Sequence, residues 1–149
     1  MNAKTSLSQR LDPVRRIAQD REDEAAKRFA ESQRVLAQRE AQLREMERYL
    51  QEYGGSASGA AAVPTLMSNR DAFLRQLAEA LRWQAGAVVE ARARFEAARD
   101  QWLRKRCDTN VLDRLIERGE TAEQRSAERK VQRELDEFAL RQRFSSQPG

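Results

Sequence analysis

Apolar residues follow a seven-residue repeat between Leu74 and Ile116. They recur at alternating intervals of three and four residues, and no proline interrupts them. One position of the repeat holds Leu74, Leu81, Val88, Phe95, Trp102, Thr109 and Ile116, and the other holds Leu77, Gln84, Ala91, Ala98, Lys105 and Leu112. Apolar side chains spaced 3.5 residues apart form a narrow seam along a helix, which another helix must cover. The stretch therefore predicts one side of a coiled coil.

A second repeat precedes it in the chain. One position holds Phe29, Leu36, Leu43 and Leu50, and the other holds Leu11, Ala18, Ala25, Ser32, Arg39, Met46 and Tyr53. Its first half is the weaker one, because Arg15 and Glu22 occupy seam positions. No glycine or proline falls between Val14 and Tyr53, so this repeat predicts a second long helix.

The first helix has a start signal at Asp12-Pro13. Aspartate accepts backbone N–H groups as an N-cap residue, and proline fits the first helical position. We expect this helix over residues 12–53, with a start one turn earlier at Leu7 as the alternative.

A segment rich in glycine, serine and alanine separates the two repeats. It ends at Pro64, which cannot continue a helix from the segment before it. Ser68, with Asp71 three residues later, resembles a capping box and marks the next helix start. The expected single domain therefore has a helix over 12–53, a loop over 54–67, a helix over 69–141 and a tail over 142–149.

These two helices predict an all-α fold, an antiparallel coiled-coil hairpin. One register sets Phe29 opposite Ala98, Ala25 opposite Trp102, Ser32 opposite Phe95 and Leu11 opposite Ile116. Each large ring then meets a small residue, as close packing requires. A slip of one heptad, which sets Glu22 against Ala98, is the alternative. In the first register the second helix overhangs after Gly119, with Val131, Leu135 and Phe138 as its apolar stripe.

Composition agrees with a long helical structure and bounds its setting. The chain has 149 residues, of which 35% are charged, with a formal net charge of +4. The single cysteine, Cys107, excludes a disulfide within the chain and favours a reducing compartment. We find no apolar signal-peptide region and no run of about 20 apolar residues. The expectation is a soluble cytoplasmic protein.

The sequence lacks the residue combinations of a thiol enzyme, a zinc site or a phosphate-binding loop, and its many carboxylates lie on a hairpin with no concave pocket. The sequence contains no histidine, so Cys107 has no partner for a thiolate–imidazole pair or a zinc site. Gly54-Gly55 lacks the lysine and hydroxyl residue of a phosphate-binding loop. We therefore expect no enzyme activity, no cofactor and no metal. Trp83 and Trp102 are interpreted as packing residues, Trp102 in the seam and Trp83 beside it.

The two flanks of the seam differ in character. One carries Glu40 and Glu47 against Arg92, Arg99 and Arg106, which is typical of solvated ion pairs. The other carries Gln42, Tyr49, Phe73 and Ala80, next to Met46, Tyr53, Leu77 and Gln84. Aromatic residues on a flank that should be polar indicate an exposed partner site. The alternative is that the rings fold over the end of the seam and thicken its core.

Several short motifs give the chain a resemblance to the FliJ family, soluble export proteins of the flagellar type III secretion apparatus. They are Arg48-Tyr49-Leu50-Gln51-Glu52-Tyr53, Ser68-Asn69-Arg70, Phe73-Leu74-x-x-Leu77-x-x-Ala80-Leu81, Trp102 and Leu135-Asp136-Glu137-Phe138-Ala139. In length and in the order of these motifs, the resemblance covers nearly the whole chain.

The resemblance implies a stalk-like coiled coil similar to the central shaft of rotary ATPases. Its partners would be the hexameric flagellar export ATPase, the cytoplasmic domain of the export-gate membrane protein, and substrate-specific export chaperones. It implies a monomer at the inner-membrane export apparatus, acting in flagellum biogenesis, motility and chemotaxis. The family's gate-binding residues correspond to Gln42, Met46, Tyr49, Tyr53, Phe73, Leu77, Ala80 and Gln84. For the ATPase we expect Arg125, Arg129 and Arg133.

Two other functions compete with this one. The chain could be the equivalent stalk of a virulence type III system or a dimeric coiled-coil adaptor. It could also bind nucleic acid through the basic stripe from Arg82 to Arg106, although a solvated helix face explains that stripe as well. The interleaved acidic residues argue against nucleic acid, so we expect none to bind.

Overall fold

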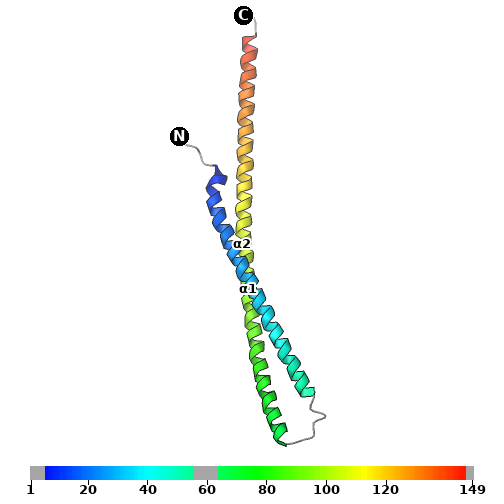
Figure 1. Cartoon of the computed structure of the whole chain (residues 1–149). Coiled ribbons are helices and arrows are strands. Elements are labelled where there is room, and N and C mark those ends of the chain that lie inside the picture. The colour runs from blue at the N-terminus through cyan, green and yellow to red at the C-terminus, as the bar shows by residue number, and fades with distance from the viewer. Residues whose placement is uncertain (1–5, 56–63, 147–149) are drawn as a thin grey trace. The chain divides into compact units, whose positions relative to one another are not determined.

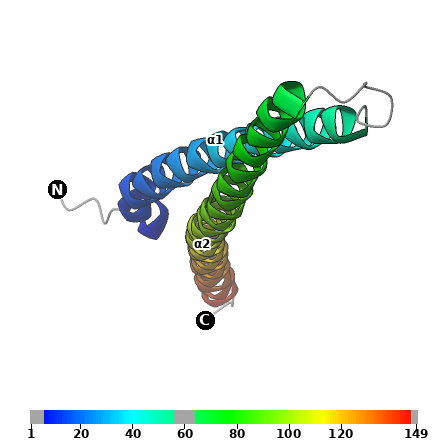
Figure 2. The same ribbon diagram turned by 90° about the horizontal axis from the view of Figure 1, so that it is seen from below.

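The computed structural model describes residues 6–55 and 64–146, and these form two helices. Helix α1 is Leu7–Gly55 and helix α2 is Pro64–Ser145 (Figure 1). Both helices are unbroken, and the described residues contain no strand (Figures 1 and 2). The predicted all-α class is confirmed. Most of the predicted loop 54–67 lies outside the described residues.

The chain divides into two compact units. Unit 1 contains Met1–Glu22 and Lys105–Gly149, and unit 2 contains Asp23–Arg104. Each unit combines one segment of α1 with one segment of α2, and each is described by itself below.

The predicted seam residues of α2 are the ones that the structure buries. Gln84, Val88, Ala91 and Thr109 are buried, and the remaining heptad positions from Leu74 to Ile116 are half-buried. Most residues between them are exposed. The heptad pattern therefore correctly identified the face of α2 that α1 covers.

In unit 2 the ring of Phe29 is stacked between two rings of α2. Its centroid lies 5.3 Å from that of Phe95 and 5.5 Å from that of Trp102. These two residues lie on either side of Ala98 in the α2 seam, so Phe29 inserts over the small side chain. The register that sets Phe29 opposite Ala98 is confirmed, and the slip of one heptad is excluded.

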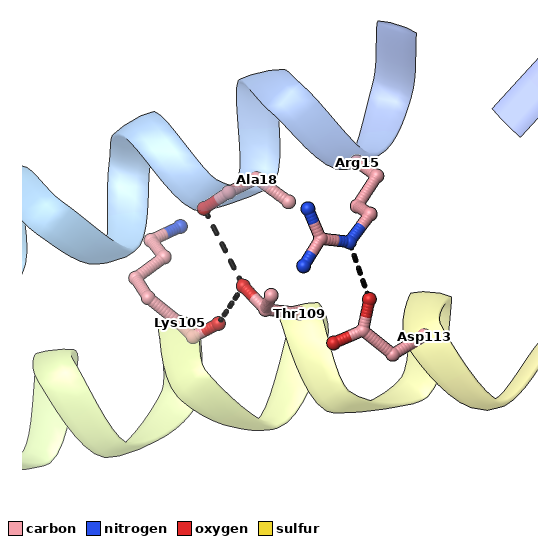
Figure 3. Close-up of polar contacts among 5 residues, drawn as sticks. All are labelled: Arg15, Ala18, Lys105, Thr109 and Asp113. Atoms are coloured by element: carbon pink, nitrogen blue, oxygen red, sulfur yellow. Dashed lines mark hydrogen bonds and ion pairs between the residues drawn. The ribbon is translucent and has the colours of Figure 1, made fainter. Parts of the chain in front are cut away.

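In unit 1 polar groups contribute to the packing between the helices. Thr109 is only 3% exposed, and its hydroxyl lies 3.1 Å from the carbonyl oxygen of Lys105 and 3.5 Å from that of Ala18 (Figure 3). One turn further along α2, the Asp113 carboxylate accepts a hydrogen bond of 2.5 Å from Nε of Arg15. The contact of Thr109 with Ala18 follows the same register as that of Phe29 in unit 2.

The start of α1 differs from the predicted one. Ser6 and Gln9 form a capping box: the Gln9 amide donates to Oγ of Ser6 over 3.2 Å, and the Ser6 amide donates to Oε1 of Gln9 over 3.3 Å. The prediction that Asp12 caps the helix and Pro13 opens it is therefore wrong, and Pro13 lies inside α1. The alternative start at Leu7 is the observed one, because Ser6 satisfies the first backbone donors a turn earlier.

This additional turn of α1 packs against Gly119. A Cβ atom built on Gly119 would lie 3.0 Å from Cδ2 of Leu7, so only glycine permits this close approach without a shift. The backbone amide of Leu7 also donates to the Glu123 carboxylate over 3.1 Å. The heptad pattern fades at Gly119, and this is where the N-terminal end of α1 packs on α2.

The start of α2 also precedes its predicted position. The helix begins at Pro64, which suits the first turn because that turn needs no N–H from it. Ser68 therefore lies within α2, and the prediction that it caps the helix is wrong. At the other end α2 continues past the predicted boundary near 141 to Ser145.

The last part of α2 carries no buried residue. Every residue from Glu120 to Ser146 is exposed. The predicted stripe of Val131, Leu135 and Phe138 is 55%, 57% and 60% exposed. Within unit 1, therefore, the helix after the Leu7 contact extends as the predicted overhang (Figure 1).

The stacking of Phe29 predicts a large effect of its truncation. We expect Phe29→Ala to lower the free energy of unfolding by about 3 kcal/mol, because a cavity would open between two rings. Phe73→Ala, at a site 46% exposed, should lower it by less than about 1.5 kcal/mol. Urea denaturation followed by circular dichroism measures both. Equal losses for the two variants would contradict the described seam.

Candidate partner-binding surfaces

The residues expected to bind the export gate gather where α1 ends and α2 begins, in unit 2. We call this set the tip patch: Gln42, Met46, Tyr49, Tyr53, Phe73, Leu77, Ala80 and Gln84. Tyr49, Tyr53 and Phe73 are 43%, 48% and 46% exposed, and Gln42 and Ala80 are exposed as well. Met46 and Leu77 are half-buried under them. The structure thus brings seven of the eight residues to the surface, wholly or in part.

Contacts with neighbouring residues on both helices hold the rings of the tip patch in place. The Tyr53 and Phe73 rings meet edge to face, with centroids 5.4 Å apart. Arg70 of α2 donates a hydrogen bond to the carbonyl oxygen of Tyr53. The guanidinium carbon of Arg48 lies 5.9 Å from the Tyr49 ring centroid, within the range of a cation–π contact. The rings therefore pack on the hairpin and still present close to half of their surface to a partner.

Gln84 differs from the other members because it is buried in the seam, with 8% of its surface exposed. Its side-chain amide lies 3.2 Å from Oε1 of Gln42 and 3.3 Å from the carbonyl oxygen of Arg39, and donates to both. Gln84 thus orients the exposed Gln42 side chain from below. Its position in the structure is that of a positioning residue rather than a contact surface.

Trp83 is a surface residue that the sequence interpretation missed. It is 75% exposed, so the prediction that it packs beside the seam is wrong. Ala80 and Ala87, three residues before and four residues after it, share its side of α2. Its exposure could have been predicted from the heptad repeat, because Trp83 occupies neither of the two seam positions and lies on the flank that carries Phe73 and Ala80. An exposed tryptophan extends the aromatic surface of the tip patch.

The second candidate surface lies on the exposed part of α2 in unit 1. Arg125, Arg129 and Arg133 are all exposed, and their spacing of four residues places them along one face of the helix. Leu140 and Phe144, which the sequence interpretation did not single out, are 53% and 77% exposed. This segment therefore combines cationic and apolar side chains that are free to contact a partner.

We also searched the described part of the chain for metal sites, shifted pKa values and membrane-spanning helices. It holds no cluster of acidic, cysteine or histidine side chains that could bind a metal ion. The pKa of Arg15 is raised by its hydrogen bond with Asp113, and that of Arg34 by its hydrogen bonds with Glu31, so both stay charged. No helix in the described ranges is both long and apolar enough to cross a membrane.

A comparison with models of protein families identifies the family of the chain. The model of a family described as flagellar FliJ protein matches residues 7–148, which is nearly the whole chain. A search of curated proteins found no match.

The buried Gln84 gives a prediction about stability. A polar residue in a coiled-coil seam fixes register at a cost in stability. We expect Gln84→Leu to raise the free energy of unfolding by about 1 kcal/mol, because Gln42 is exposed and can bond to water instead. The control is Gln42→Ala, which should change stability by less than about 0.5 kcal/mol. Thermal unfolding measures both, and a clear loss of stability in Gln84→Leu would contradict the assignment.

Proposed function

The chain belongs to the FliJ family of flagellar proteins, and from this we propose that it is a non-enzymatic stalk of the flagellar export apparatus that binds both the export ATPase and the export gate. The match over residues 7–148 is the observation that carries the proposal. It also favours the flagellar apparatus over a virulence secretion system. In this role the protein acts in the cytoplasm, at the inner-membrane export apparatus.

The tip patch supports binding of the cytoplasmic domain of the gate protein. Protein interfaces are enriched in tyrosine, tryptophan, phenylalanine and methionine at their centre, and the tip patch together with the neighbouring Trp83 offers all four. Tyr53 and Phe73 are held by a contact between the helices, and Tyr49 contacts Arg48 on its own helix, so less side-chain freedom remains to be lost on binding. Rigid aromatic side chains of this kind are typical binding hot spots.

The exposed part of α2 supports binding of the ATPase ring. A single rod inside a six-fold ring cannot contact all subunits equally, so it favours some conformations of the ring over others. A helix without a covering partner, carrying arginines on one face and apolar residues on others, suits such unequal contacts. The export chaperones are the third class of partner in this proposal, and we assign them no residues.

The gate proposal is tested by Tyr49→Ala combined with Phe73→Ala. Both residues are more than 40% exposed, so the double variant should remain folded and helical. Loss of two aromatic hot spots should weaken binding of the gate's cytoplasmic domain by about a hundredfold or more. Isothermal calorimetry with the purified gate domain measures this, and ATPase binding by the same variant is the control. Unchanged gate affinity would remove the tip patch from the interface.

The ATPase proposal is tested by reversing the charges of Arg125, Arg129 and Arg133 to glutamate. The three side chains are exposed, so the fold of α2 should survive. Binding to the export ATPase should weaken at least tenfold, and salt should affect it less than in the original chain. Surface plasmon resonance at two ionic strengths measures both effects. Gate binding should stay unchanged; if ATPase binding also stays unchanged, the arginines lie outside that interface.

A further inference from the structure

A groove of 590 Å³ runs along one flank of the helix pair in unit 2. Its floor is formed by Ser32 and Val35 of α1 and by Ala87 and Ala91 of α2. None of the tip-patch residues lines it. Most of the surface that lines the groove is apolar. The groove forms because these small side chains leave space beside the seam unfilled.

The groove continues the flank on which the tip patch lies. Val35 is seven residues from Gln42, and Ala87 is seven residues from Ala80. Residues one heptad apart occupy the same position around a coiled coil. One side of unit 2 therefore carries aromatic residues near the helix ends and a small-residue groove further along.

The dimensions of the groove fit an α-helix. Its α1 lining extends from Lys27 to Arg39, which is about 18 Å at the helical rise of 1.5 Å per residue, or about three turns. Small floor residues let a third helix approach closely. A helix that docks there would need apolar residues at intervals of three and four to cover the floor.

The charges on the rim determine which helix would fit. The two acidic residues, Glu31 and Glu90, are already paired: both oxygens of Glu31 accept hydrogen bonds of 2.8 Å from Arg34, and Glu90 accepts one of 3.1 Å from Arg94. Lys27, Arg28 and Arg39 are exposed and form no ion pair with the other described residues. The groove therefore presents unpaired positive charges along its α1 side, beside an apolar floor.

We propose that this groove binds an acidic amphipathic helix of a partner protein, with apolar side chains on the Val35–Ala87 floor and carboxylates facing Lys27, Arg28 and Arg39. The site is separate from the tip patch and from the exposed part of α2. It gives the protein a third interaction surface, and it does not depend on the proposed gate and ATPase contacts.

The test uses two designed peptides and the full chain. Both peptides carry leucines at positions i, i+3, i+4 and i+7; one has glutamates on the flanks of the leucine face and the other has lysines there. Fluorescence anisotropy should show the acidic peptide binding at least tenfold more tightly than the basic one. Circular dichroism should show that it becomes more helical on binding. Equal affinities, or no binding of the acidic peptide, would overturn the proposal.

Variants of the chain locate the binding. Arg28→Glu with Arg39→Glu should weaken binding of the acidic peptide at least tenfold. The matched control, Arg82→Glu with Arg99→Glu, makes the same charge change at exposed positions outside the groove and should alter affinity less than twofold. Ala87→Leu fills the floor and should also weaken binding, with no loss of helicity. Equal losses in the two charge-reversal variants would show general electrostatic attraction and contradict a groove site.

A second copy of the chain is the rival occupant. Sedimentation equilibrium of the original chain and of Ala87→Leu decides between the two. A monomer in both cases agrees with the proposal. A dimer that Ala87→Leu dissociates would show that the groove is a self-association surface, and the proposal would fail.

Discussion

The insertion of Phe29 between Phe95 and Trp102 is the contact on which the helix pairing of unit 2 depends. It sets a large ring opposite Ala98, and a shift of one heptad would move the ring away from its two neighbours. Because a two-helix pair buries only a strip of surface, few residues can enforce alignment. The alignment in turn determines which residues of each flank come together, and so where the tip patch and the groove form.

Polar residues in the seam supply a different kind of constraint. Gln84 in unit 2 and Thr109 in unit 1 are buried, and each bonds to a backbone carbonyl of α1. Leucine at these positions would bury more apolar surface but would accept several registers equally well. These polar residues therefore lower the stability of the helix pair but restrict it to one register. Gln84 also orients Gln42 on the surface, which links seam packing to the candidate interface.

The heptad pattern predicted the seam, the register and the exposed part of α2, because burial in a coiled coil follows directly from sequence spacing. The helix ends were predicted less well. Asp12-Pro13 is a strong local signal, but the reciprocal bonds of Ser6 and Gln9 and the packing of Leu7 on Gly119 favour an earlier start. Trp83 was misplaced because large apolar rings are usually packed, although its position outside the seam already indicated an exposed side chain. The groove forms because small side chains leave space beside the seam, and the spacing of apolar residues along the sequence does not predict such a space.

Hydrogen exchange of the full chain, alone and with the cytoplasmic domain of the export gate, tests the central claim most directly. The claim is that the helix pair of unit 2 presents the tip patch as the gate-binding surface. Bound gate domain should slow exchange of backbone amides in residues 42–53 and 73–84 and leave residues 120–146 unchanged. Protection confined to residues 120–146, or no change at the tip despite complex formation, would contradict the account.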